Sequence, residues 1–173
     1  MPAAAAALDR TEASCLSPIR TAANGTQGSS PRGIDIAHAA LARDQLGEYQ
    51  AQAAIAALHA DAPRVEETDW VQIAEWYDEL LRFADTPIVR LNRAVAVGEA
   101  DGPPAGLAAL AAIDEHIPRR EAVAAYLHEK NGDLELAACL YADAARNAPN
   151  LAERDHQMRQ AARLNERLAA RQE

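Results

Sequence analysis

The strongest constraint on this chain is the regular spacing of its helix breakers. From about Ile34 onward, turns containing proline, glycine or aspartate recur about every ten to twenty residues. The segments between these turns are rich in alanine, leucine, glutamate and arginine, which favour helix, whereas β-branched residues are few and aromatic residues make up 4%. We therefore predict an all-α fold whose helices span residues 34–46, 48–61, 68–84, 87–100, 104–115, 119–131, 134–148 and 150–171.

The chain divides into two parts by composition. Residues 1–33 carry many serine, proline and glycine residues with almost no apolar periodicity, so we expect this segment to be poorly ordered. Residues 34–173 form the predicted helical domain, and a chain of 173 residues suits one domain. Short connections should make consecutive helices antiparallel neighbours.

The charge and cysteine content restrict the setting of the protein. Twenty-six acidic residues against seventeen basic ones give a net charge of -9, which opposes direct nucleic-acid binding. Lys130 is the single lysine, so a polybasic patch for a membrane surface is missing. The stretch 1–8 is too weakly apolar for a secretory signal, and Cys15 and Cys139 are too few for a disulfide framework. We expect a cytoplasmic protein without membrane contact.

The segment from 68 to 100 has the features of a helical hairpin. Trp70, Ile73, Tyr77 and Leu80 recur at steps of three and four, which places them on one face of a helix. Thr68 or Asp69 can cap the start of that helix. A threonine and a proline at 86–87 repeat this logic for the next helix.

Two segments match the length and pattern of tetratricopeptide units. Residues 69–100 give two helices within about 34 residues, the length of one repeat. A second unit from 119 contains a Gly-Asp turn at 132–133, the small residues Ala137 and Ala144, and Tyr141 between them. The small residues would let a neighbouring helix approach, and Tyr141 would fill the gap between repeats. This pattern predicts stacked antiparallel hairpins of tetratricopeptide type, an α-solenoid.

Three runs of residues together resemble one known family. They are the Tyr-Gln-Ala-Gln-Ala-Ala-Ile run at 49–55, Thr-Asp-Trp at 68–70 with Tyr-Asp-Glu-Leu-Leu at 77–81, and Leu-Asn-Arg-Ala-Val-Ala at 91–96. They resemble the C-terminal extension of a group of extracytoplasmic-function RNA polymerase sigma factors, over roughly residues 45–168. Ala51 stands where that family usually has leucine. Residues 1–33 contain no counterpart of the two sigma regions that precede the extension in the family.

The resemblance implies a function in bacterial transcription. The family's extension is a helical, tetratricopeptide-bearing region that supports or regulates transcription initiation, which implies RNA polymerase or sigma-factor regions as protein partners. One alternative is a general tetratricopeptide adaptor that binds a peptide in its groove, and another is a small helical enzyme. The candidate signature or interaction residues are Tyr49, Gln50, Gln52, His59, Asp69, Trp70, Trp76, Tyr77, Asp78, Asn92 and Arg93.

Several of these candidates allow two interpretations. His59 follows Ile55 by one turn, so it could be a buried switch near neutral pH or, with more weight, a hydrogen-bonded core histidine. Asn92 and Arg93 lie between apolar residues, so they either hold neighbouring helices together or bind a partner, and we place the structural role first. Trp76 is offset from the apolar stripe, which fits an exposed anchor as well as partial burial.

Motifs for metal binding or catalysis are missing from the sequence. The five histidines form no pair at i and i+4, and neither Cys-x-x-Cys nor His-Glu-x-x-His occurs. Asp114, Glu115 and His116 are adjacent in sequence, so their side chains should point in different directions at a solvated helix end. Phosphate-binding glycine loops and the Gly-x-Ser-x-Gly motif are also missing. We predict no metal, cofactor or catalytic residue.

Overall fold

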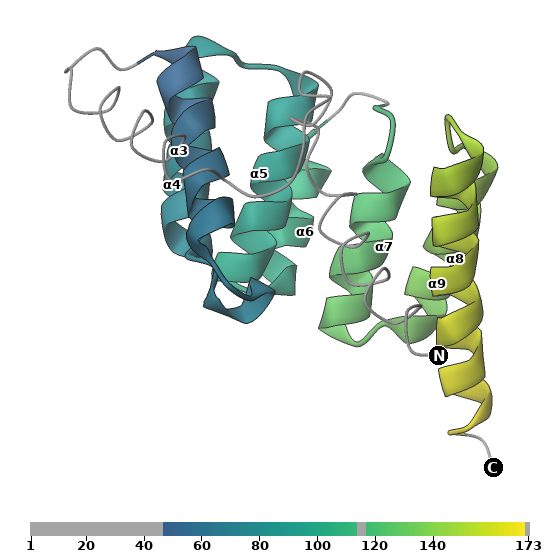
Figure 1. Cartoon of the computed structure of the whole chain (residues 1–173). Coiled ribbons are helices and arrows are strands. Elements are labelled where there is room, and N and C mark those ends of the chain that lie inside the picture. The colour runs from purple at the N-terminus through teal and green to yellow at the C-terminus, as the bar shows by residue number, and fades with distance from the viewer. Residues whose placement is uncertain (1–46, 114–116, 172–173) are drawn as a thin grey trace, which may run out of the picture.

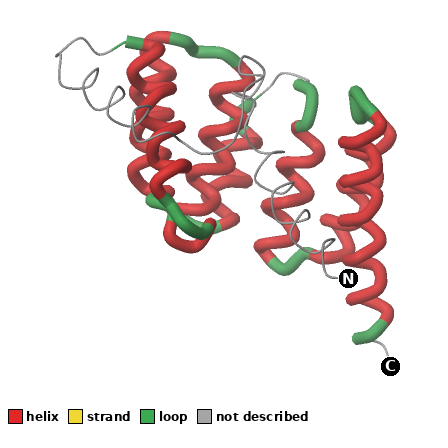
Figure 2. Tube along the Cα trace, in the orientation of Figure 1, coloured by secondary structure: helices red, strands yellow, loops and turns green. Residues whose placement is uncertain are grey.

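The computed structural model describes residues 47–113 and 117–171, which form an all-α structure. Within these ranges there are seven α-helices, one 3-10 turn and no strand (Figure 2). The elements are α3 (Glu48–Asp61), η2 (Val65–Glu67), α4 (Trp70–Phe83), α5 (Pro87–Ala100), α6 (Pro103–Ala111), α7 (Arg120–Asn131), α8 (Leu134–Arg146) and α9 (Leu151–Ala169). The all-α prediction is confirmed. The predictions for residues 1–46 and for the 114–116 cluster lie outside the described residues.

The helices alternate between two layers along the chain. Figure 1 shows α3, α5, α7 and α9 toward the viewer, with α4, α6 and α8 behind them. Each helix packs on the next one in the sequence, and α5 also contacts α7. The result is a row of adjacent helices, which is the arrangement expected of a helical repeat.

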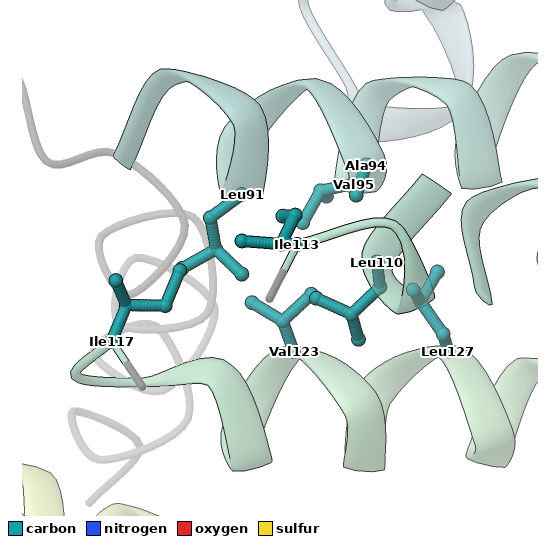
Figure 3. Packing of buried hydrophobic residues seen from close by; sticks show 8 residues of the cluster. All are labelled: Leu91, Ala94, Val95, Leu110, Ile113, Ile117, Val123 and Leu127. Carbon is teal, nitrogen blue, oxygen red and sulfur yellow. The ribbon is translucent and has the colours of Figure 1, made fainter. Parts of the chain in front are cut away.

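Three buried apolar clusters follow one another along this row. One joins α3, α4 and α5, with Ile55, Ile73 and Tyr77 among its members. The second joins α5, α6 and α7 (Figure 3), and the third joins α7, α8 and α9 around Tyr141 and Leu164. Helices α5 and α7 each present one face to one cluster and another face to the next. This sharing explains why buried residues occur on more than one face of α5, among them Val89, Leu91 and Ala96.

Side-chain caps begin three of the helices. The Asp69 carboxylate accepts a hydrogen bond from the Gln72 amide at 3.0 Å, and the Thr86 hydroxyl accepts one from the Val89 amide at 3.3 Å. The Asn150 side chain accepts one from the Glu153 amide at 2.8 Å. These bonds satisfy backbone donors that a helix leaves free at its first turn.

Some predicted boundaries were wrong by a few residues. Helix α4 begins at Trp70 instead of 68, because Asp69 is its cap. Helix α6 ends at Ala111 instead of 115, and Ile113 then packs into the second cluster from the following loop (Figure 3). Helix α7 begins at Arg120, since Arg119 has a left-handed backbone with φ 71°. Helices α8 and α9 end at 146 and 169, short of the predicted 148 and 171.

Two glycines bring α5 and α6 into backbone contact. A methyl group added at Gly106 would lie 2.7 Å from the Cα of Gly98 and 2.8 Å from the carbonyl oxygen of Ala94. The side chain of Leu127, fully buried on α7, fills the space beside both glycines. This crossing therefore favours glycine at position 106, because even the methyl group of alanine would overlap the backbone of α5.

The predicted small positions of the second hairpin lie inside the structure. Ala137 and Ala144 are buried on α8, and Tyr141 between them is 5% exposed. The Tyr141 hydroxyl donates a hydrogen bond to Glu129 Oε2 on α7 at 3.2 Å. In the described residues, every helix is too short or too polar to span a membrane.

Candidate interaction surface

The first signature run occupies the exposed beginning of α3. Tyr49 is 80% exposed, the largest exposure among the exposed bulky apolar side chains of the described residues. Gln50 and Gln52 are half-buried, and the Gln52 side-chain Nε2 donates a hydrogen bond to Glu48 Oε1 at 3.0 Å. Tyr49 contributes little to the apolar core, so the fold itself does not require an aromatic ring at this position.

The second run supplies packing and capping on α4. Tyr77 belongs to the core of the first cluster, and its burial raises the pKa of its hydroxyl to about 12. Trp70 and Trp76 are half-buried and pack against the same cluster, so Trp76 is partly covered instead of fully exposed. Asp69 is the helix cap. These residues therefore stabilise the hairpin.

The expectation of a buried His59 was wrong. The side chain is exposed near the end of α3, and the prediction failed because the buried stripe of that helix runs through Ala51, Ala54 and Ile55. The His59 ring lies edge-on to Trp70, with 5.3 Å between the ring centroids. The part of the ring covered in this way is removed from water, which lowers the pKa of His59 below its ordinary value.

The third run joins α4 to α5. Arg93 Nε donates to Asp78 Oδ1 at 2.5 Å, and the partners are 15 residues apart in the sequence. The structural role placed first for Arg93 is the one this contact supports. Asn92 is half-buried one position earlier, and its side-chain amide has no hydrogen-bond partner within the described part of the chain.

Sequence reasoning missed a set of charged contacts between the helices of the front layer. Lys130 Nζ at the end of α7 donates to both carboxylate oxygens of Glu99 on α5, at 2.6 and 2.5 Å. The Tyr126 hydroxyl donates to the same carboxylate at 2.5 Å. The Lys130 ammonium also lies 5.3 Å from the centre of the Tyr126 ring.

The same pattern joins α7 to α9. Arg163 Nη2 donates to both oxygens of Glu129 at 2.8 Å, and Arg167 Nη1 lies 3.5 Å from Glu129 Oε1. At the opposite end of α7, Arg119 donates to both oxygens of Glu153 at 2.6 and 3.2 Å. The hydrogen-bonded partners in these pairs are 34 residues apart in the sequence.

In these contacts the carboxylates are buried more deeply than the cations. The carboxylate side chains of Glu99, Glu129 and Glu153 are 7%, 17% and 11% exposed. Their cationic partners are between 37% and 47% exposed, so the carboxylates lie beneath and the cations face outward. The sequence offered no signal for this, because the pairs exist only after α5, α7 and α9 have been placed side by side.

Among the other polar groups of the described residues, two carboxylates have local hydrogen-bond partners. In these ranges, no three histidine, cysteine, aspartate or glutamate side chains are placed to hold a metal ion. Asp85 accepts from Arg90 and Asp133 accepts from Asn131 and His128, and these hydrogen bonds lower the pKa of both carboxyls. Both contacts are explained by local helix-end structure.

Comparison with known proteins gives one partial match. No protein family and no solved structure matches the chain. An uncharacterized protein of Rhizobium meliloti (strain 1021) is 52% identical over 71 residues, which cover 41% of this chain and 17% of the relative. The relative is thus more than twice as long as this chain, and the chain covers less than a fifth of it.

Proposed function

We propose that this chain is a protein-interaction domain of transcription initiation that binds RNA polymerase or sigma-factor regions. In this proposal its helices are hairpins of tetratricopeptide type, as in the C-terminal extension of extracytoplasmic-function sigma factors. The observation that carries it is the alternation of the helices between two layers, with α5 touching α7 across α6. Such a row presents a broad surface for proteins, and the proposal assigns no catalytic chemistry to it.

Among the signature residues, the one without a role in folding supports the proposal. Most of them have folding roles, since Tyr77 fills the core, Asp69 caps α4, and Asp78 binds Arg93. Tyr49 differs, because an aromatic side chain that is 80% exposed gains little from folding. Tyrosine is enriched at binding hot spots, so a partner is the physical reason we assign to Tyr49.

The partial match is compatible with this setting. A region 52% identical to part of this chain lies within a much longer protein. An interaction domain that works beside sigma regions would be joined to them or would meet them in a complex. The relative carries no functional description, so the transcriptional part of the proposal depends on the resemblance of the three runs.

Affinity capture tests the proposal. We expect the tagged full-length chain to retain bacterial core RNA polymerase, or a purified two-region sigma factor, or both. Tyr49→Ala should weaken retention while leaving the melting temperature unchanged. Phe83→Ala is the matched control, because Phe83 is also an exposed aromatic residue, at 46%, and lies outside the three runs. Absence of retention by the unsubstituted chain, with and without sigma regions, would refute the proposal.

A further inference from the structure

Three outward cations, one at the end of α7 and two on α9, form a defined group on a protein with net negative charge. We name Lys130, Arg163 and Arg167 the cationic row. Their side chains are 41%, 44% and 47% exposed, whereas the whole chain has a net charge of -9. Two carboxylates, Glu99 and Glu129, lie beneath the row, so three positive charges stand over two negative ones.

Hydrogen bonds hold Lys130 and Arg163 in place, and donors on Arg163 and Arg167 remain for a ligand. Lys130 is fixed by both oxygens of Glu99, and Arg163 by Glu129 and by the side-chain oxygen of Gln160. Among the described residues, Arg163 Nη1 has no acceptor, and Arg167 makes no hydrogen bond although it lies 3.5 Å from Glu129. Side chains already fixed in this way lose less entropy when a ligand binds.

We propose that the cationic row is the docking site for an acidic peptide segment of a partner protein, recognised by its aspartate or glutamate carboxylates. Arginine guanidinium groups match carboxylates because two parallel N–H donors meet two oxygens. Lys130 on α7 binds Glu99 on α5, and Arg163 on α9 binds Glu129 on α7, so we expect the two charges to lie about one helix spacing apart, on the order of 10 Å. A segment with carboxylates at that separation engages both.

The short length of the row favours a short acidic peptide over a nucleic acid. A phosphate backbone extends past the row and meets the repulsion of a chain with a net charge of -9. A short acidic segment can end where the row ends. The inference rests on the proposed function in one respect only, because it assumes that the chain binds a protein.

The test uses a glutamate-rich synthetic peptide and the same peptide with glutamine at every glutamate. We expect the full chain to bind the first and not the second, and we expect added salt to weaken binding. Arg163→Gln and Arg167→Gln should each weaken binding about threefold, the size of an exposed ion pair, and the double variant about tenfold. Melting curves confirm that the variants are folded.

Arg154→Gln is the matched control. Arg154 lies on the same helix, nine residues before Arg163 and therefore half a turn around α9, and it is also about half exposed. Failure of the glutamate peptide to bind would overturn the inference, as would an equal loss in the control variant or tighter binding of a single-stranded oligonucleotide.

Polymerase and sigma-factor capture separates the inference from the proposed function. Peptide binding that depends on the row, without capture of polymerase or sigma regions, supports the inference and refutes the function. Capture that persists unchanged in the double variant, together with failure of the glutamate peptide to bind, refutes the inference and leaves the function standing.

Discussion

The contact between α5 and α6 gives the sharpest test of the fold. Replacing Gly106 by alanine adds one methyl group, 2.7 Å from Gly98 Cα, 2.8 Å from the Ala94 carbonyl oxygen and 2.9 Å from Leu127 Cδ2. Two of these atoms belong to the backbone of α5, so a rotamer change cannot remove the overlap. The two helices must move apart, which disturbs the cluster shared by α5, α6 and α7.

Two opposing terms set the expected size of the effect. Overpacking of a close-packed core costs about 1–3 kcal/mol, whereas alanine is favoured over glycine within a helix by about 1 kcal/mol. We therefore expect Gly106→Ala to lower the free energy of unfolding by about 1 kcal/mol. For a domain of this size that corresponds to a fall of roughly 0.5 M in the urea midpoint.

Urea unfolding followed by far-ultraviolet circular dichroism provides the assay. Ala108→Gly is the control for helix propensity, because Ala108 is exposed on the same short helix. It should lower the free energy of unfolding by about 1 kcal/mol through propensity alone. If Gly106→Ala instead raised the midpoint by as much as the control lowered it, the close approach of α5 and α6 would be refuted.

Three further predictions concern buried or partly covered polar groups. Gln157 is 4% exposed and its Oε1 has no partner within the described part of the chain, so Gln157→Met should raise the free energy of unfolding by about 1 kcal/mol in urea titrations; a loss of stability would contradict this. Burial raises the pKa of Tyr77 to about 12 from 10.0, so the stability it contributes is present below pH 10 and is lost as the pH rises toward 12; Tyr77→Phe should reduce the fall in unfolding free energy between pH 10 and 11 by about 1 kcal/mol, and an unchanged fall would contradict the assignment. The pKa of His59 is lowered by its partial burial, so its contribution is complete above 6.5 and is lost as the pH falls below that value; His59→Gln should flatten the melting temperature between pH 7 and 5, and an equally steep profile would show that His59 is not responsible.

Local signals in the sequence were sufficient for much of the fold. Thr86 followed by Pro87 predicted the start of α5, and the range 87–100 agrees with the structure. Asp69 was one of two candidate caps for α4, and it makes the capping hydrogen bond. Such features involve residues only three positions apart, so they can be read without knowing the tertiary structure.

Contacts between distant residues could not be predicted in the same way. Arg119 adopts a left-handed backbone that is uncommon for a residue with a side chain, and its guanidinium binds Glu153, 34 residues later. The cationic row likewise depends on which helices become neighbours. His59 shows the related difficulty on a single helix, because an alanine-rich stripe does not reveal which side will be buried.

The sharing of α5 and α7 between successive apolar clusters has a consequence for cooperativity. Each cluster is formed by consecutive helices, so its contacts close short stretches of chain. Loss of α9 would open the cluster around Tyr141, yet it would reach the cluster around Tyr77 only by way of α7 and then α5. Disturbances therefore propagate from neighbour to neighbour, and the two ends of the row can open nearly independently of each other.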